Sequence, residues 1–529
     1  MHPLDPEGLS YLTEKGDGPF YLMNGESFAI ENVPVGTRVL YPRPPLPNVG
    51  DLRAAVRHAL DHPIGMDPLR ACLNPGMKVT IAFDDISLAL PLMKAPDCRQ
   101  IALEVVLDYL AEAGVDDFHL VVAVALHRHM HDHEVRYQCG RRIFDAYWHT
   151  KRLYNYDAED KDNNIVLGHT EHGHIVEIQK RAATSDLLIY VNLNLIALNG
   201  GHKSVGVGLA TYRCIRTNHN IEHNLGARSI NDPPRSRLHR TFDEIGRYVE
   251  KHVRVFHLEM TVDTDTFPWY LGYLQKQEHT WNAAEWLSSR INKYFLDCTP
   301  LSLNRAIFFA NKAPYHVTSV QAGECEAVHR ITLENVYRQQ NIEIQGQSDI
   351  YIVPVPYVMP YSVHSVMNPI LVHAMGLGYL FNFYKGRPVV KEGGSIILLH
   401  PLEEKFNPVH HPSYIELWEK LALTRDHHEV DRKYADELAL NPRYIELYRF
   451  HNAYHGFHPV SMWNWGAHGR MHCGQVIIVN PRSRNAAARL GWETAPNLTE
   501  AIEMARTRQG ANASISLCHS PPIAMWEVK

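Results

Sequence analysis

Residues 78–83 read KVTIAF and residues 118–126 read FHLVVAVAL, and these two apolar runs indicate the fold. Each run is short, nearly continuous in hydrophobic residues and followed by polar residues, as is typical of a strand buried in a parallel sheet. Between them, residues 101–110 carry apolar side chains at helical spacing and Gly114 follows as a C-terminal cap. This order predicts an α/β fold with a mostly parallel, doubly wound sheet.

A third buried strand, residues 187–191 (LLIYV), ends just before a polar loop. The three strands are followed by Asp84 and Asp85, by His127, and by the Gly-Gly-His-Lys segment at 200–203. In parallel sheets, ligands bind beyond the carboxyl ends of the strands. The sequence therefore predicts a functional site where these three strand ends meet.

The second half of the chain predicts another α/β unit. Its expected strands are residues 305–310, 349–355, 395–399 and 475–480, its expected helices are 413–422, 431–438 and 498–506, and a late strand is expected at 514–517. We expect an N-terminal extension (1–75) that wraps the first domain, two domains (76–295 and 296–510), and a C-terminal segment (511–529) that returns to the first domain. The active site is expected in the cleft between the two domains.

Composition narrows the class of protein. The chain has 529 residues, 45% of them hydrophobic and 21% charged, with a net charge of −6. This length favours two domains, and no basic stripe indicates nucleic acid. No signal peptide or long apolar run is seen, so we expect a cytoplasmic protein without a membrane partner. The eight scattered cysteines indicate reduced thiols, and the 34 histidines point towards acid–base or metal chemistry.

The segment 127–134 (HRHMHDHE) is dense in histidine. Pairs at i, i+4, His127 with His131 or His129 with His133, would suit a zinc site on a helix. The alternative is a solvated helix start in which Glu134 pairs with an arginine. His127 by itself, at a strand end, is favoured as a base that takes a proton from a substrate hydroxyl. A second histidine-rich stretch, 168–174, is interpreted as a hairpin or exposed turn.

The segment 200–203 combines two features. Paired glycines allow positive φ and a close approach of the backbone to a ligand, and Lys203 is a potential nucleophile. His219 follows in the sequence Thr-Asn-His-Asn, and His223 is either a second ligand or a residue of a helix face.

Together these segments resemble the nickel-dependent lactate racemase family. The matching elements are Asp84-Asp85-x-Ser87, His127-Arg128-x-Met130-x-x-x-Glu134, Gly200-Gly201-x-Lys203, His219, Ala313-Pro314 with Gln321, and the segments 388–394 and 485–491. The resemblance covers most of the chain through the order and spacing of these elements.

The resemblance implies a nickel-pincer nucleotide, a pyridinium mononucleotide whose two sulfur-bearing arms hold nickel, which is made by dedicated cofactor-biosynthesis enzymes. It implies that Lys203 is the covalent attachment point, that Asp85, Ser87, Gly200 and Gly201 bind the cofactor, and that His219 is the nickel ligand. It further implies that His127 deprotonates a substrate hydroxyl while a hydride moves to the cofactor and returns to the opposite face. Imidazole is a suitable nickel ligand.

The sequence also departs from the family. The family's second catalytic histidine is Leu193 here, and two cations that suit a substrate carboxylate are Leu88 and Glu324. Losing such charge-assisted hydrogen bonds costs roughly 1.5–3 kcal/mol each. We therefore expect a hydroxyl-bearing substrate other than lactate, such as a sugar acid or polyol. The catalytic residues expected are His127, Gln321 and Glu324, with Glu324 or a recruited histidine such as His316 as the second proton carrier.

Three other functions stay open at the level of sequence. The first is one-sided redox chemistry with the same cofactor, favoured by a single good base at His127. The second is a non-catalytic cofactor-binding relative. The third is a zinc hydrolase using residues 127–133. The sequence predicts no oligomeric state.

Overall fold

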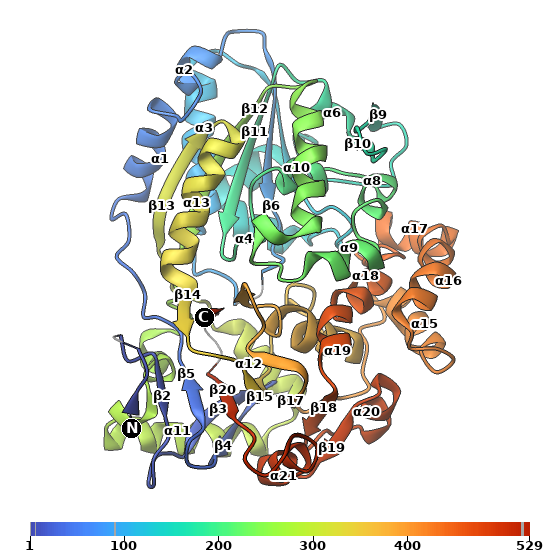
Figure 1. Ribbon diagram of the computed structural model, residues 1–529. Coiled ribbons are helices and arrows are strands. Elements are labelled where there is room, and N and C mark those ends of the chain that lie inside the picture. The colour runs from blue at the N-terminus through green and yellow to red at the C-terminus, as the bar shows by residue number, and fades with distance from the viewer. Residues whose placement is uncertain (1, 6, 89–90, 520–522) are drawn as a thin grey trace.

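The computed structural model describes residues 2–5, 7–88, 91–519 and 523–529, and Figure 1 shows two main sheets, one above the other in this view. The upper sheet has six strands in the order β13-β12-β11-β6-β7-β8. Their bounds are β6 Lys78–Asp84, β7 Asp117–Ala123, β8 Leu153–Asn155, β11 Leu187–Asn194, β12 Val255–Val262 and β13 Val317–Gly323. All neighbouring pairs are parallel except β12 with β13. The predicted α/β fold with mostly parallel sheets is thereby confirmed.

Helices cover this sheet. Helix α13 (Cys325–Gln340) packs on β12 and β13, and α10 (Arg237–Glu250) lies to its right in Figure 1. Helix α3 (Cys98–Glu112) connects β6 to β7 and packs against α1 (Leu52–Asp61). Gly114 follows α3 with φ of +68°, the conformation expected of a C-terminal glycine cap.

The lower sheet has eight strands in the order β1-β2-β5-β20-β15-β17-β18-β19. Their bounds are β1 His2–Pro3, β2 Ser10–Leu12, β5 Arg38–Leu40, β15 Ser348–Pro354, β17 Val390–Leu399, β18 Gln475–Val479, β19 Glu493–Ala495 and β20 Ile515–Cys518. The helices that follow in this half are α14 Pro369–His373, α15 Pro412–Lys420, α16 His427–Ala439, α17 Pro442–Phe450, α18 His458–Trp465, α19 Ala467–His472, α20 Arg484–Leu490 and α21 Leu498–Gln509. The strands expected at 349–355, 395–399 and 475–480 and the three expected helices are confirmed, with small shifts at their ends.

Two expectations need correction. Residues 305–310 are not a strand but the end of helix α12 (Leu301–Ala310), which begins directly after Pro300 and buries Leu301, Asn304 and Phe308 at helical spacing. The late strand does not return to the first sheet. β20 lies between β5 and β15 in the lower sheet, where Ile515 and Leu517 enter its core.

The last strand, β21 (Met525–Val528), also joins the second half, because it pairs with β14 (Asn341–Ile344) and β16 (Tyr384–Lys385). At the other end of the chain, β2 and β5 belong to the lower sheet, whereas α1 packs against the upper one. The chain therefore crosses from the lower sheet to the upper one between β5 and α1, whereas its C-terminal strands stay in the second half. Within the part of the chain that the structure describes, no helix is both long and apolar enough to cross a bilayer.

The remaining smaller elements match simple sequence signals. β9 (Asn164–His169) and β10 (Ile175–Gln179) form the hairpin expected around residues 168–174. β3 (Phe20–Asn24) and β4 (Ser27–Glu31) form a second hairpin. All eight cysteines are free thiols, as expected.

Candidate functional site

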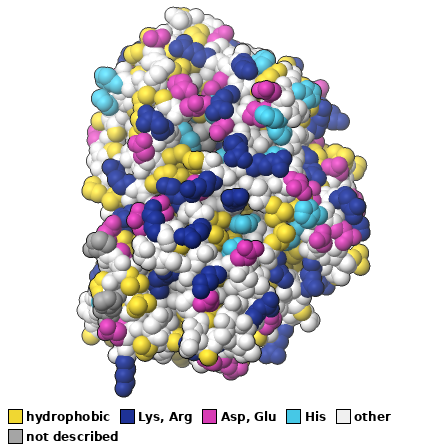
Figure 2. All heavy atoms as spheres, in the orientation of Figure 1, with side chains coloured by type: hydrophobic (Ala, Val, Ile, Leu, Met, Phe, Trp, Pro, Cys, Tyr) yellow, Lys and Arg dark blue, Asp and Glu magenta, His cyan; other side chains and the backbone are white. Residues whose placement is uncertain are grey.

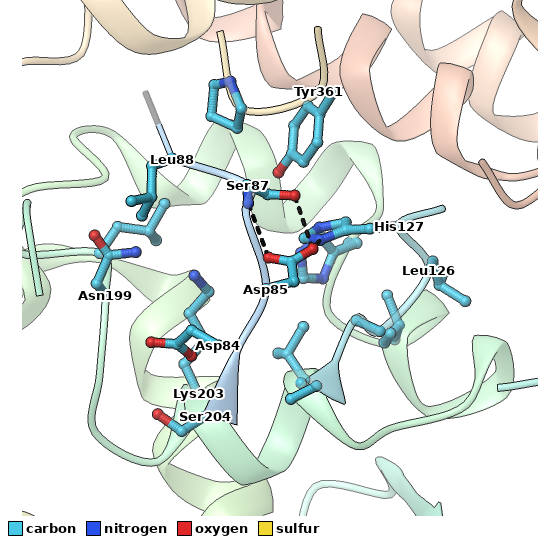
Figure 3. Close-up of a pocket in the computed structure, with 18 of the residues that line it drawn as sticks. Asp84, Asp85, Ser87, Leu88, Leu126, His127, Asn199, Lys203, Ser204 and Tyr361 are labelled. Carbon is cyan, nitrogen blue, oxygen red and sulfur yellow. Dashed lines mark hydrogen bonds and ion pairs between the residues drawn. The ribbon is translucent and has the colours of Figure 1, made fainter. Parts of the chain in front are cut away.

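The carboxyl ends of β6, β7 and β11 open into one cavity (Figure 3). Its lower wall comes from the first half of the chain and includes Asp84, Asp85, Ser87, Leu88, His127, Asn192, Leu193, Asn199, Gly200, Lys203, Ser204 and His219. The opposite wall comes from the second half, which carries the lower sheet of Figure 1. Because Tyr361 is at the top of Figure 3, this wall is called the upper wall, and it includes Pro360, Tyr361, Tyr379, Phe457, His458, Ser461, Met462 and Trp465. The cavity therefore lies between the two halves, where the sequence predicts the active site.

His127 is held by the carboxylate of Asp85. Its Nδ1 lies 2.9 Å from Asp85 Oδ2, and the same carboxylate accepts hydrogen bonds from the backbone N–H and hydroxyl of Ser87, at 3.0 and 2.8 Å. Burial raises the pKa of Asp85, but the neighbouring His127 and the Ser87 hydrogen bonds outweigh it and hold the pKa below its usual value. Ionised Asp85 thus fixes the tautomer in which Nδ1 carries the proton and leaves Nε2 as the basic nitrogen of the ring.

Lys203 is the first residue of α7 (Lys203–Gly208), directly after the glycine turn. Gly200 and Gly201 have φ of +82° and +61°, so the prediction of a positive-φ turn is confirmed. A Cβ at Gly200 would overlap Asn194 Oδ1, and the turn is tied down by the N–H of Gly201, which donates to Glu259 Oε1 at 2.6 Å. Only glycine fits this close approach.

The electrostatic surroundings of Lys203 favour a reactive amine. Burial lowers the pKa of Lys203, and the carboxylates of Asp84 and Asp85 partly oppose this. Burial likewise raises the pKa of Asp84 to about 6, although its Oδ2 accepts a 2.8 Å hydrogen bond from the backbone N–H of Leu193. A buried lysine with a lowered pKa can act as a nucleophile.

His219 has the properties of a metal ligand. Burial, together with the nearby positive charges of Lys203 and His127, lowers its pKa to about 3, so the ring is neutral. Its Nδ1 bonds the side-chain oxygen of Asn218, which leaves Nε2 with its lone pair. A neutral imidazole fixed at one nitrogen by an acceptor is the usual form of a metal-binding histidine.

The second half adds a histidine that sequence reasoning missed. His458, the first residue of α18, lies with its ring edge-on to that of His127, the centroids 5.6 Å apart. Its Nδ1 is 2.6 Å from the hydroxyl of Tyr414, and burial lowers its pKa well below the usual value. No spacing in the sequence relates His458 to His127, since only the packing of the two halves brings them together.

Aromatic rings surround the two histidines. Tyr361 lies with its ring 5.0 Å from that of His127 and 4.4 Å from that of His458. Its hydroxyl is 3.3 Å from that of Tyr379, which belongs to a π-helical turn (Ala374–Leu380). Trp465 stacks near His219 at 6.4 Å. This wall limits the access of water to the basic nitrogens.

Three residues expected at the site lie elsewhere. Gln321 is on β13, where its Oε1 accepts from Ser319 Oγ at 3.3 Å. Glu324 caps α13 by accepting from the N–H groups of Glu326 and Ala327. His316 is half exposed and pairs with Asp263. The physical reason for Glu324 is that β13 runs antiparallel to β12, so its carboxyl end, Gly323 and Glu324, lies at the edge of the sheet opposite the cavity.

The histidine-rich segment does not form the expected chelating pairs. Helix α4 (Asp132–Cys139) begins only after His131, so His127 and His131 do not share a helix face. His129 packs against the ring of Tyr448, and His131 contacts His410. Glu134 makes a buried, two-pronged ion pair with Arg128 at 2.7 and 2.8 Å, which agrees with the salt-bridge alternative. His223 lies on helix α9 (Ile221–Ala227).

The comparisons with known proteins agree with this architecture. Residues 27–229 match the family described as the lactate racemase N-terminal domain. The chain is 24% identical over 169 residues to a lactate racemase of Thermoanaerobacterium thermosaccharolyticum, which is 31% of this chain and 37% of that protein. It is 27% identical over 172 residues to a lactate racemase of Lactiplantibacillus plantarum, which is 32% of this chain and 38% of that protein. The matched segment thus spans less than half of these relatives.

Solved structures extend the likeness to nearly the whole fold. The lactate racemase apoprotein of Thermoanaerobacterium thermosaccharolyticum matches 96% of this chain and 99% of its own, with a TM-score of 0.60 and 17% identity. A protein from Thermotoga maritima matches 92% of this chain and 100% of its own, with a TM-score of 0.51 and 13% identity. The resemblance to the lactate racemase family is confirmed over residues 27–229, and outside that segment the likeness is one of fold.

Proposed function

We propose that this protein is a racemase or epimerase of a hydroxyl-bearing small molecule and that it works with a nickel-pincer nucleotide attached at Lys203. The observation that carries the proposal is the convergence of Lys203, His219 and His127 on one cavity in a chain with a lactate racemase N-terminal domain. Lys203 has a pKa lowered by burial, and His219 has a pKa lowered to about 3, as their proposed roles require.

The residues present fit the cofactor. Lys203 offers a buried amine for the covalent bond, and neutral His219 offers an unprotonated Nε2 for nickel, a metal for which imidazole is suited. Asp85, Ser87 and the glycine turn border the same space. When bound, the cofactor would supply a hydride acceptor and donor for the substrate carbon.

His127 is the proposed proton acceptor. With Nδ1 bonded to Asp85, its Nε2 can take the proton of a substrate hydroxyl, and ionised Asp85 would stabilise the imidazolium that results. Tyr361 and the apolar residues of the upper wall would exclude water during the transfer.

His458 supports inversion rather than one-sided redox chemistry. The family histidine replaced by Leu193 is missing, but His458 places a second neutral imidazole in the cavity from the opposite half of the molecule. We propose that it returns or removes the second proton, the role that the sequence assigned to Glu324 or His316.

The cavity wall argues for a substrate other than lactate. Among the described residues that line the cavity, Lys203 is the only lysine or arginine, and Leu88 and Leu193 are both buried and apolar. A small carboxylate would therefore find no free cation once Lys203 carries the cofactor. A larger 2-hydroxy acid, a sugar acid or a polyol with further contacts fits this wall better.

The experiment uses protein produced together with the cofactor-making enzymes. We expect an intact-mass adduct and nickel in the wild type, no adduct in Lys203→Ala, and an unchanged adduct in the control Lys161→Ala, an exposed lysine. Chiral chromatography of a panel of hydroxy acids, sugar acids and polyols should then show inversion of at least one compound.

The outcomes separate the alternatives. A stable keto product without inversion would support the one-sided redox enzyme, and a loaded protein that turns over nothing in the panel would support the non-catalytic relative. The absence of any adduct on wild-type protein despite the cofactor-making enzymes would overturn the proposal.

A further inference from the structure

A largely buried group of metal-ligating side chains lies next to the glycine turn, outside the residues that line the cavity described above. His202, Glu250 and Cys325 each present a ligand atom, and these atoms all lie within 4.8 Å of one another. His202 is 4% exposed and Cys325 1% exposed. The three residues come from the turn before α7, the end of α10 and the start of α13, so the group joins three separate elements.

A second buried imidazole lies against the carboxylate of Glu250. His257, on β12, is fully buried, and neither of its ring nitrogens has a hydrogen-bond partner among the described residues. Its Nε2 lies 3.5 Å from Glu250 Oε1, and His202 Nδ1 lies 3.7 Å from the same oxygen. An unpartnered buried imidazole is costly, so its orientation towards Glu250 requires an explanation.

The spacing of Glu250 from the two imidazoles is that of ligands in one coordination shell. Zinc binds histidine nitrogen at about 2.0–2.1 Å and thiolate sulfur at about 2.3 Å in a tetrahedron, whose edges are then roughly 3.3–3.8 Å. The distances from Glu250 Oε1 to His257 Nε2 (3.5 Å) and to His202 Nδ1 (3.7 Å) match such edges. Both are longer than the donor–acceptor distance of a good hydrogen bond. Glu250 also ends α10, where a carboxylate is unfavourable next to the helix C-terminus and a cation would relieve the repulsion.

An ion can reach the group. A second cavity, between α10 and α13, is lined by His202, Asp243, Arg247, Cys325 and Glu326 among others. These two helices lie on the face shown in Figure 2, where Lys and Arg side chains form a band across the middle. The cavity also touches Gly200, Gly201 and Lys203, so it borders the same glycine turn as the site described above.

We propose that His202, Glu250, Cys325 and His257 form a structural zinc site. The bound ion would tie the residue before Lys203 to β12, α10 and α13 and so hold the glycine turn in place. The site is independent of the nickel cofactor and does not require the proposed function.

The test uses the full chain produced without the cofactor-making enzymes, so that no pincer nucleotide contributes metal. After reconstitution with Zn²⁺ and removal of excess ion, elemental analysis should find about one zinc per chain. Cys325→Ser should weaken zinc binding by at least about tenfold in a chelator competition, since even outer-shell changes can cost this much. Zinc should raise the Tm of the wild type but not that of the variant.

Cys98→Ser is the matched control, because Cys98 is also a buried cysteine at the first position of a helix. It should bind zinc like the wild type, and circular dichroism checks that both variants fold. As a second readout, Co²⁺ should give thiolate charge-transfer absorption in the wild type and in Cys98→Ser but not in Cys325→Ser. Wild-type protein that holds no stoichiometric zinc, or equal binding by the two variants, would overturn the proposal.

Discussion

At the scale of single residues, the site depends on carboxylates whose pKa values are shifted in opposite directions. Asp85 has a lowered pKa because His127 and Ser87 stabilise its charge, whereas burial raises the pKa of its neighbour Asp84 to about 6. Adjacent groups with opposite shifts are typical of functional sites. In the proposed function the two aspartates therefore have distinct roles, Asp85 as the anion that holds the base His127 and Asp84 as a proton-binding group beside Lys203.

Asp85→Asn should lower turnover by about 100-fold or more, because an amide stabilises the imidazolium of His127 far less than a carboxylate does. The KM should change much less than kcat. The measurement is steady-state kinetics of inversion on the loaded enzyme. Ser87→Ala, which removes only one hydrogen bond to Asp85, is the control and should cost less. An equal loss of turnover in Asp85→Asn and Ser87→Ala would contradict the idea that the negative charge of Asp85 stabilises the imidazolium of His127.

Asp84 should make the folded protein less stable as the pH rises. Its pKa is raised from 3.8 to about 6, so the folded state binds the proton more tightly than the unfolded chain. The stabilisation is complete below about pH 4 and is lost as the pH rises through 6. Asp84→Asn should therefore be more stable than the wild type at pH 8, by about 1–2 kcal/mol.

Urea unfolding at pH 5 and pH 8 checks this expectation. The advantage of Asp84→Asn should shrink at pH 5, where much of the wild-type Asp84 is protonated. The exposed Asp162→Asn serves as the control and should show no such dependence. An advantage of Asp84→Asn that is equal at both pH values would contradict the raised pKa.

At the scale of elements, the glycine turn before α7 is the feature that sets the position of Lys203. Gly200→Ala should destabilise the protein by about 3 kcal/mol, since the new Cβ would overlap Asn194 Oδ1 and meet Glu259 Oε1 at 2.6 Å in addition to the cost of positive φ. Loading at Lys203 should fall as well. Thermal unfolding and intact mass measure the two effects.

Gly173→Ala is a close control for this substitution. Gly173 has the same φ of +82° in the β9–β10 hairpin, but a Cβ added there would have no other atom within 4 Å. The substitution should cost only about 1 kcal/mol, which is the cost of the backbone conformation alone. If Gly200→Ala and Gly173→Ala lowered the free energy of unfolding equally, the close packing around Gly200 would contribute nothing to stability.

The orientation of strands decides which predicted residues reach the site. The ends of β6, β7 and β11 could be predicted from apolar runs followed by polar residues, and Asp85, His127 and Lys203 do line one cavity. Gln321 and Glu324 do not, because the sequence does not reveal that β13 is antiparallel to β12. The apolar run at 305–310 was likewise ambiguous between strand and helix over so short a length.

At the scale of the whole molecule, the site is completed only where the two halves meet. Tyr361, His458 and Trp465 come from the second half and cover the strand ends of the first. The chain also passes from β5 of the lower sheet to α1, which packs against the upper sheet, and this connection couples the two halves. Substitutions in the upper wall should therefore affect chemistry without removing the cofactor.

His458→Gln should lower the rate of inversion by about 100-fold while leaving the Lys203 adduct and nickel content intact, because it removes a proton carrier and no cofactor ligand. Chiral chromatography measures the rate of inversion, and elemental analysis measures the nickel content. Tyr414→Phe, which removes the partner of His458 Nδ1, should give a smaller loss and a shifted pH–rate profile. A His458→Gln enzyme with full activity would restrict proton transfer to His127.

The sequence by itself determined the α/β class, the order of the buried strands and the residues that follow them, since hydrophobic period and strand ends are local properties. It also determined the glycine turn with its lysine and the resemblance to the lactate racemase family. The tertiary structure decided which of these residues meet. It placed Glu324 as a helix cap, brought His458 beside His127, and joined His202, Glu250, His257 and Cys325, because strand direction and the packing of distant segments are not encoded in any local pattern.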